Sequence, residues 1–476
     1  MSATNTHLAG TPQPGSAPPR GAGCRALLLS AAYFFLILTA YYMLRPIRET
    51  MAIEKGADTL PWLMTATLVA MLVANPLYAL LVSRLPRRSF VPAAYAFLGL
   101  NIVGFFVAAR TLAPETLHLL GYAFYVWLSV FNLFVVSIFW SIMADIFREE
   151  QAKKIFGVVA VGGTLGAICG PVTVNALLGG TLSIQPPLGD GGSAWTIASF
   201  RALSREWVFL AALVPLAGAI LCARGLIGRS ERTEPDGAAR EPTRDALAGF
   251  RLIAGSRYLK VLSLYMLLFT VTSTLVYIEQ ARMIATHFAS DTERTQAFAR
   301  LDFYTNALTL LAQLFLTRQI IRLIGLGGTL SVLPTLTFAG FGALAATGSV
   351  PVLFGYQVMR RGVHYAIDRP AREVLFTPLS PDEKYKSKAF LDTFVYRAGD
   401  MLGGWAPTWL AVVAGWMQLS SPIPNWTLWI PLSLLWIVVA VVLGSMLRRL
   451  GSSSVPSPEV QRSEVQSPEV PRPGET

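Results

Sequence analysis

The sequence has little charge: 14% of its 476 residues are charged and 53% are hydrophobic, and the mean hydropathy is +0.50. Cysteine is scarce, and Cys24, Cys169 and Cys222 have the spacing neither of metal ligands nor of a disulfide framework. There is no HExxH, no GxSxG and no Walker-type GxxxxGKS or GxxxxGKT pattern, which excludes an ATP-driven motor at the level of motif. We therefore expect no enzyme, no cofactor and no metal site.

Long apolar runs are abundant, each close to the roughly 20 residues that a helix needs to cross a bilayer. Because lipid offers the backbone no water, runs of this length and continuous apolarity are helices and not barrel strands. The sequence therefore predicts an all-α polytopic membrane protein. We count twelve runs: 26–44, 60–83, 90–109, 117–143, 155–178, 206–226, 258–280, 302–324, 328–346, 351–367, 386–416 and 425–447.

Lys and Arg in the short connections predict which side of the membrane faces the cytoplasm. Connections containing Arg84, Arg148 and Arg318 fall on one side, whereas 345–350 and 418–425 on the other side have no Lys or Arg. The prediction is a bacterial inner-membrane protein with both termini cytoplasmic. The net charge of +11 fits an anionic inner leaflet, so the lipid bilayer is an expected partner and nucleic acid is not.

Polar segments divide the chain. Residues 1–24 lack the apolar stretch of a cleavable signal peptide, and 449–476 repeat Ser-Pro-Glu-Val, a composition that predicts disorder. Residues 228–257 begin with a stretch dense in Arg, Glu, Asp and Pro, which predicts a cytoplasmic linker. Two six-helix halves, 25–227 and 258–448, are then the predicted domains.

The two halves resemble each other. Placing Pro171 on Pro407 also places Gly163 on Gly399, and Arg397 then stands where the first half has a neutral residue. Parallel six-helix repeats are the build of many secondary transporters, with the ligand site between the halves near the membrane midplane.

Glycines recur every fourth residue at Gly162, Gly166 and Gly170. A glycine loop that cradles phosphate needs a strand before it and a free helix N-terminus after it. Neither is available within an apolar span, so we interpret this stripe as a surface for close helix packing.

Arginines stand in or beside the apolar runs, where a charge costs on the order of 3 kcal/mol unless it faces a partner or a water-filled cavity. Arg45 and Arg48 follow the first run, Arg361 interrupts the tenth and Arg397 the eleventh. Guanidinium groups match phosphate and carboxylate geometry, so the pattern indicates an anionic ligand. The alternative, which stays open, is that Arg45 and Arg48 are interfacial anchors with an ion pair to Glu49.

Other ionisable residues in the second half have two interpretations. Glu279 and Arg282 are three residues apart, so they are either a self-neutralising pair or part of a ligand or proton-coupling site. Arg397 and Asp400 are also three apart, and either they pair with each other or Arg397 faces the cavity while Asp400 holds it. His364 lies four residues from both Arg360 and Asp368 on one helix face. A histidine there is either a satisfied interior residue or a proton relay.

Several short segments together resemble one known family. These are residues 44–50 (Leu-Arg-Pro-Ile-Arg-Glu-Thr), 139–140 (Phe-Trp), 150–154 (Glu-Gln-Ala-Lys-Lys) and 386–392 (Lys-Ser-Lys-Ala-Phe-Leu-Asp). They are similar to segments of the ATP/ADP (nucleotide triphosphate/diphosphate) translocases, and the resemblance extends over 25–447. It implies a major facilitator-like fold and exchange of nucleotides by alternating access.

The resemblance also suggests site residues. A lysine that the nucleotide exchangers use at the end of the first span falls on Arg48. Their glutamate in the fourth span falls on Leu128, with Asn132 the nearest polar residue on that face. Their glutamate in the seventh span falls on Tyr277, and their lysine in the eleventh falls on Asp400. The chain thus looks like a divergent branch that keeps the scaffold and changes the site.

We therefore predict a secondary active transporter that moves a small anionic, phosphorylated or nucleotide-like solute, ATP or ADP included, by alternating access, with exchange as one mode. Proton-coupled efflux of an amphipathic compound, and a membrane-embedded lipid-modifying enzyme or scaffold, stay open. No obligate protein partner is evident. The candidate substrate-binding residues are Arg45, Arg48, Asn132, Tyr277, Glu279, Arg282, Arg361, His364, Arg397 and Asp400.

Overall fold

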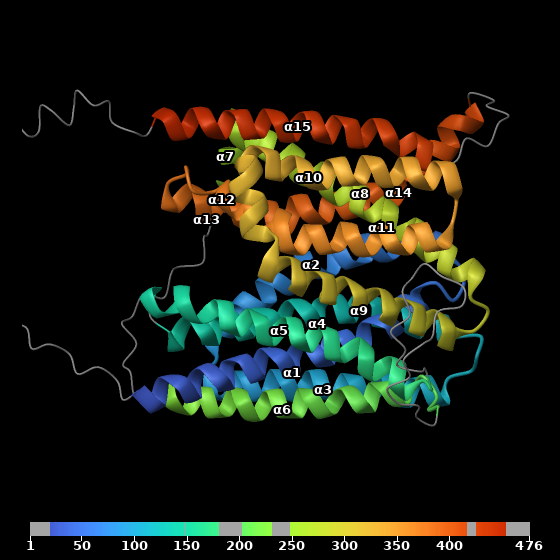
Figure 1. Cartoon of the computed structure of the whole chain (residues 1–476). Coiled ribbons are helices and arrows are strands. Elements are labelled where there is room, and N and C mark those ends of the chain that lie inside the picture. The colour runs from blue at the N-terminus through green and yellow to red at the C-terminus, as the bar shows by residue number, and fades with distance from the viewer. Residues whose placement is uncertain (1–19, 148, 180–201, 231–247, 417–424, 454–476) are drawn as a thin grey trace, which may run out of the picture.

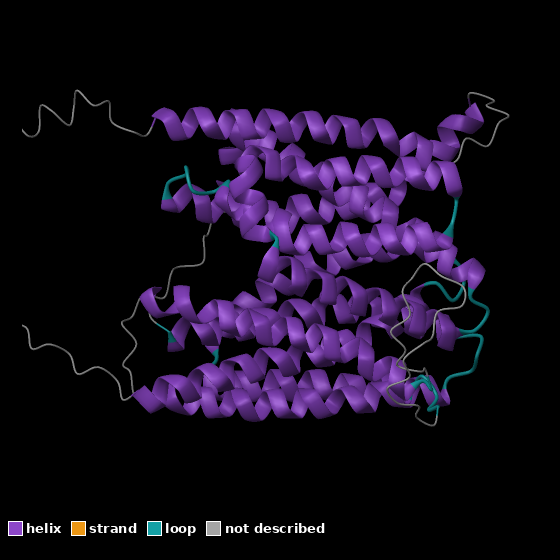
Figure 2. Cartoon of the chain, viewed as in Figure 1, coloured by secondary structure: helices purple, strands orange, loops and turns teal. Residues whose placement is uncertain are grey.

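The computed structural model describes residues 20–147, 149–179, 202–230, 248–416 and 425–453. Over these residues the chain is helical and contains no strand (Figure 2). The predicted polar ends lie outside the described residues over 1–19 and 454–476, as does 231–247 of the predicted linker. The domain limits stay a prediction.

The helices follow the predicted runs closely. In the first half they are α1 (Arg20–Ala52), α2 (Leu60–Arg84), α3 (Arg87–Thr111), α4 (Leu117–Ile146), α5 (Glu149–Leu177) and α6 (Trp207–Ser230). In the second half they are α8 (Arg257–His287), α9 (Asp291–Phe315), α10 (Thr317–Thr347), α11 (Val350–Val363), α12 (Arg369–Val374), α13 (Pro381–Phe390), α14 (Tyr396–Trp416) and α15 (Asn425–Ser453). A short helix, α7 (Ala248–Gly255), precedes α8, and π-helical turns link α11 to α12 (His364–Asp368) and α13 to α14 (Leu391–Val395).

Nine helices in the described part of the chain are long and apolar enough to cross a membrane. The helices α9, α11 and α14 run alongside them in the bundle but do not meet that criterion (Figure 1). Charged residues such as Asp302, Arg360 and Arg397 interrupt their apolar sequence. The helix α11, with 14 residues, is also too short for the criterion, and α1 places Arg45, Arg48 and Glu49 inside the bundle although it meets the criterion.

One predicted boundary is wrong. The run 302–324 does not form a single helix, because α9 ends at Phe315 and α10 begins at Thr317. The helix α9 begins eleven residues earlier than predicted, at a capping box in which Ser290 and Glu293 bond each other's backbone N–H groups. Its polar first turns hid it from a search for apolar runs.

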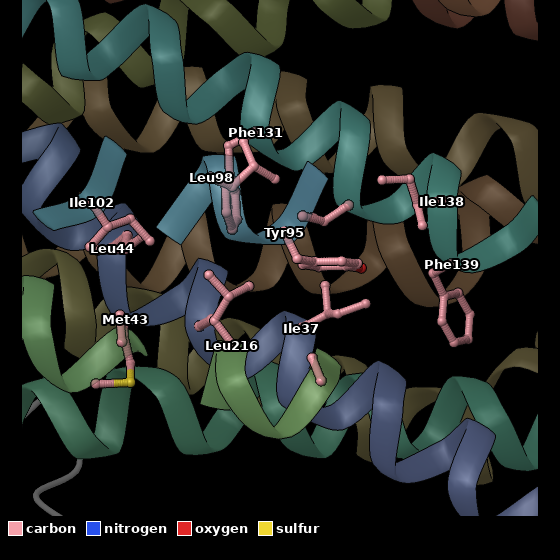
Figure 3. Close-up of a cluster of buried hydrophobic side chains, with 14 of the residues drawn as sticks. Ile37, Met43, Leu44, Tyr95, Leu98, Ile102, Phe131, Ile138, Phe139 and Leu216 are labelled. Carbon is pink, nitrogen blue, oxygen red and sulfur yellow. The ribbon is translucent and has the colours of Figure 1, made fainter. Parts of the chain in front are cut away.

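Most helices of each half lie together, with α2 of the first half and α9 of the second between the two groups (Figure 1). In the first half α1 packs against α4, α5 and α6, and in the second α8 packs against α14 and α15. Contacts of α2 with α14, and of α9 with α5 and α1, join the halves. Each half has a large hydrophobic cluster, and a smaller cluster contains residues of both halves. Figure 3 shows part of the cluster in the first half, including Ile37 of α1, Tyr95 of α3 and Phe131 of α4.

The glycine stripe of α5 packs against α1, as predicted. A Cβ atom on Gly166 would lie 2.2 Å from the Phe35 carbonyl oxygen, and one on Gly170 would lie 2.9 Å from the Thr39 carbonyl oxygen. Gly162 meets the α1 backbone in the same way. The absence of side chains thus lets the two helices approach at backbone distance, as small residues do in membrane interfaces.

The predicted repeat recurs in helix packing. Gly163 of α5 packs against Phe34 of α1, where a Cβ would lie 2.3 Å from the ring. The aligned Gly399 of α14 packs against Thr270 of α8, where a Cβ would lie 1.8 Å from Oγ1. The α1–α5 and α8–α14 pairs therefore use glycine at equivalent positions.

The change Gly166→Ala should lower the stability of the folded protein by about 1–3 kcal/mol, because the new methyl group overlaps backbone atoms that cannot rotate away. The thermal midpoint of the detergent-solubilised protein measures this. Gly104→Ala is the matched control, since no atom lies within 4 Å of a Cβ at that position of α3. Equal midpoints for the two variants would contradict the packing account.

Candidate functional site

A cavity of about 780 Å³ lies between the two halves. Its lining comes from α1, α2, α4 and α5 on one side and from α8, α9, α11, α12 and α14 on the other. Six arginines and four carboxylates are part of this lining: Arg45, Arg48, Arg360, Arg361, Arg369, Arg397, Glu49, Asp302, Glu373 and Asp400. The cavity is therefore polar and has an excess of positive charge.

The halves touch at the end of the bundle where α1 ends and α9 begins. Polar contacts across the halves are concentrated there: Thr295 Oγ1 to Thr50 Oγ1 at 2.9 Å, Arg205 Nη1 to Asp291 Oδ2 at 2.8 Å, and Gln296 Nε2 to the Leu178 carbonyl oxygen at 3.1 Å. At the opposite end, where α1 begins and α15 ends, the exposed residues Arg369 and Glu373 belong to the cavity lining. The cavity is thus closed toward the first end and reaches the surface at the second.

One carboxylate oxygen holds two of the arginines. Oδ1 of Asp302 accepts a hydrogen bond from Arg45 Nη1 at 2.9 Å and another from Arg361 Nη2 at 2.7 Å. Arg45 belongs to the first half, whereas Asp302 and Arg361 belong to the second. Asp302 is 3% exposed, so these are ion pairs largely screened from water. The Asp302 cluster, defined as these three residues, therefore connects the halves through charge.

A second cluster surrounds Glu49 of α1. Glu49 accepts hydrogen bonds from Arg48 and from the Tyr277 hydroxyl of α8, which again joins the halves. Arg48 also donates to Ser129 Oγ at 3.3 Å and lies 4.6 Å from the centroid of the Tyr125 ring. The helix α1 continues unbroken through these residues, which places Arg45, Arg48 and Glu49 on one helix inside the bundle and not at its edge.

On α14, Arg397 donates to Asp400 Oδ2 at 3.1 Å, and Thr274 of α8 donates to Asp400 Oδ1 at 3.1 Å. Both charged residues line the cavity, as does Asn132 of α4. Arg397 and Asp400 therefore pair with each other and also face the cavity, so the two interpretations of this i, i+3 pair are compatible.

His364 lines the cavity from the π-helical turn after α11. Its Nδ1 lies 3.0 Å from Asp368 Oδ2, and Tyr265 donates to Asp368 Oδ1 at 2.6 Å. The imidazole stacks on Phe269 with 4.3 Å between ring centroids. These contacts fix the position and orientation of the ring.

The structure places Glu279 and Arg282 away from the cavity lining. Arg282 Nη1 pairs with Glu279 Oε1 at 3.0 Å, and Arg282 Nη2 lies 3.3 Å from Asp58 Oδ1. The reason is helix phase, because residues that share a face of a helix are three or four apart. The cavity face of α8 contains Tyr277 and Gln280. Glu279 is two residues from Tyr277 and one from Gln280, so it does not share that face.

The other eight predicted site residues line the cavity, but sequence reasoning missed Asp302 and treated Glu49 only as a partner of Arg45. The sequence does contain a pattern that indicates Asp302. Asp302, Asn306, Thr309 and Gln313 recur at helical spacing and all line the cavity, so they form a polar stripe on α9. A search for polar periodicity, in addition to apolar runs, would have found it.

No three His, Cys, Asp or Glu side chains in the described ranges come together in a group that could hold a metal ion. What the cavity offers instead is guanidinium groups, which present several N–H donors to an anion in a fixed geometry.

Solved structures similar to this one are transporters. A bacterial homologue of the human lysosomal transporter Spinster, in an inward-facing and unoccupied conformation, aligns with a TM-score of 0.54 and 16% identity over 92% of this chain and 100% of its own. A transporter of the POT family in complex with 5-aminolevulinic acid gives a TM-score of 0.56 and 11% identity over 90% of this chain and 96% of its own. At these identities the likeness shows the fold.

The sequence relatives have names that specify ADP and ATP. The ADP,ATP carrier protein 1 of Chlamydia muridarum is 23% identical over 454 residues, which cover 82% of each chain. The plastidic ATP/ADP-transporter of Solanum tuberosum is 23% identical over 492 residues, which cover 92% of this chain and 76% of its own. The pattern of the Major Facilitator Superfamily matches residues 29–359. The protein is thus a multi-pass membrane transporter, and it belongs to the Major Facilitator Superfamily.

Proposed function

We propose that this protein transports an anionic, phosphorylated or nucleotide-like solute by alternating access. The observation that carries the proposal is the excess of arginine over carboxylate in the lining of the central cavity. A cationic, water-accessible cavity lowers the energy of a polyanion that could not otherwise cross hydrocarbon. Guanidinium–phosphate pairs are also among the stronger charge-assisted hydrogen bonds. Relatives named ADP,ATP carriers and ATP/ADP-transporter support a nucleotide as the solute.

The predicted orientation in the membrane indicates the side to which the cavity opens. With both termini in the cytoplasm of a bacterium and the chain in its inner membrane, the end where α1 begins and α15 ends faces inward. The cavity, whose lining reaches the surface at that end, then faces the cytoplasm, and the contacts of Thr50 with Thr295 and of Arg205 with Asp291 close the outer side. Outward opening requires these contacts to break.

The carboxylates act as internal substitutes for the solute. Asp302 pairs with Arg45 and Arg361, and Glu49 pairs with Arg48, so each of these cations has a carboxylate partner in the empty cavity although the three keep a net positive charge. An incoming polyanion competes with Asp302 and Glu49 for the same donors. Because Asp302 links Arg45 across the halves, this competition loosens a contact between them, which couples binding to the conformational change.

Exchange follows if the empty carrier reorients poorly. A cavity with net positive charge is costly to move through an occluded state without its anion. Proton-coupled efflux of an amphipathic compound would instead use neutralisation of a carboxylate during the cycle and would respond to a pH gradient. Membership of a transporter superfamily weighs against the lipid-modifying enzyme and the scaffold.

Uptake of labelled ATP into proteoliposomes preloaded with unlabelled ADP or ATP tests the proposal directly. We expect uptake that depends on preloading and that Arg48→Glu abolishes, because the reversed charge repels phosphate beside Glu49. Arg110→Glu, at an exposed position near the end of α3, is the control for charge reversal as such and should retain uptake. Uptake driven by a pH gradient and indifferent to preloading would favour efflux, and no uptake by folded wild-type protein would remove the nucleotide as solute.

The change Asp302→Asn should destabilise the ligand-free protein by about 3 kcal/mol, because Arg361 loses its carboxylate partner and Arg45 keeps only the 3.7 Å contact with Glu49. ATP should then raise the thermal midpoint more in this variant than in wild type, since ATP no longer competes with the carboxylate. Asp291→Asn is the matched control: it breaks the pair with Arg205 outside the cavity and should not enlarge the ATP effect. An ATP effect equal in the two variants would contradict the role given to Asp302.

A further inference from the structure

Arg360 differs from the other arginines of the cavity. It lies near the end of α11, lines the cavity and is 1% exposed, which makes it one of the largest fully buried side chains of the described residues. Arg45, Arg48, Arg361 and Arg397 each pair with a carboxylate. Within the described part of the chain, no carboxylate pairs with Arg360.

The hydrogen bonds of Arg360 are incomplete on one edge. Nη1 donates to Ser273 Oγ of α8 at 3.1 Å, whereas Nε and Nη2 have no partner within the described structure. Nε and Nη2 lie side by side along one edge of the planar guanidinium group, and this edge can bind two oxygens of one anion. The Phe269 ring lies 5.9 Å from the guanidinium carbon, a contact that leaves both N–H groups unfilled. The edge that would bind two oxygens of one anion is therefore empty.

An empty edge at this depth needs an explanation. A buried cation without a counter-ion or a full set of acceptors is costly, and such groups are rare in native structures. A purely structural arginine would be expected to fill these donors with a carboxylate or with carbonyl oxygens, as Arg294 does with the carbonyls of Phe288 and Ala285. Arg372 also has one unfilled donor, Nη1, but lies outside the cavity lining, whereas Arg360 has two on one edge and lines the cavity, so the acceptor that Arg360 lacks is one that can enter from the cavity.

A second unfilled group lies one turn away. Gln357 of α11 donates through Nε2 to Gln280 Oε1 at 2.7 Å, and its own Oε1 has no partner in the described structure. Gln357, Gln280 and Ser273 all line the cavity. The surroundings of Arg360 thus combine a cationic fork with a free acceptor, which can bind a hydroxyl group of the solute next to its anionic group.

We propose that Arg360 binds the terminal phosphoryl group of the solute through Nε and Nη2. This inference rests on the proposed function and adds to it the residue that distinguishes phosphorylated from unphosphorylated solutes. The Asp302 cluster must release its carboxylate before it binds an anion, whereas Arg360 needs no such exchange. The Nε and Nη2 atoms of Arg360 have almost no exposed surface, so the side chains around them must move before a phosphoryl group reaches them, while Arg45 and Arg361 engage the remaining phosphates as Asp302 is displaced.

Binding of ATP, ADP, AMP and adenosine to detergent-solubilised protein tests this assignment. In wild type, affinity should rise with the number of phosphates. In Arg360→Met the Kd for ATP should rise about 10- to 100-fold, the range of one lost charge-assisted bidentate contact, while the Kd for adenosine changes less than about twofold. The thermal midpoint of ligand-free Arg360→Met should change little, because the variant removes a buried cation that has one hydrogen bond, to Ser273, and no ion pair among the described residues.

Two further variants keep the test decisive. Arg372→Met is the matched control, because Arg372 is also buried and lies 5.7 Å from Phe269 but is not part of the cavity lining, so the ATP-to-adenosine affinity ratio should match that of wild type. Arg360→Lys keeps the positive charge but loses the two-donor edge of the guanidinium group. Its ATP-to-adenosine affinity ratio should therefore fall between those of wild type and Arg360→Met.

An unchanged ratio in Arg360→Met, or an equal loss of affinity for adenosine and ATP, would overturn the assignment and leave the proposed function standing. A lower ligand-free midpoint together with an intact ratio would show that Arg360 is structural. Wild-type protein that binds none of the four compounds would contradict the proposed function itself, and this inference with it.

Discussion

The structure depends on how charge is held inside helices that cross a membrane. An ionisable group at that depth is tolerated when it has a partner or faces water. This protein places six arginines around one cavity and pairs four of them with a carboxylate: Asp302 for Arg45 and Arg361, Glu49 for Arg48, and Asp400 for Arg397. The lining residues of α9, α11 and α14 include part of this paired charge, and α1 contributes the rest.

The same ion pairs connect structure to transport. Arg45–Asp302 and Glu49–Tyr277 both run from α1 to the second half, so the charges that would bind an anion also hold the halves together. The α1–α5 and α8–α14 pairs pack closely through glycine and give each half a rigid body. A solute that alters the contacts between two such bodies changes their relative position without unfolding either, as alternating access requires.

Apolar length and charge pattern predicted most of this fold, because a spanning helix must be long and apolar whatever it packs against. They failed at α9, whose first turns are polar and whose beginning is set by the Ser290–Glu293 capping box. The site was predicted in part. Arginines in apolar runs stand out in a sequence, so Arg45, Arg48, Arg361 and Arg397 could be found, whereas pairing is a property of three-dimensional contact. The long-range partner Asp302, and the placement of Glu279 and Arg282 off the cavity face of α8, needed the structure.

The most direct test of the central claim is an experimental structure of the protein with ATP bound. The account predicts phosphate density in the cavity between α1, α9 and α11, with at least one of Arg45 and Arg361 turned from Asp302 toward a phosphate oxygen. Density for ATP elsewhere, for example beside Glu279 and Arg282, with both bonds to Asp302 intact, would contradict it.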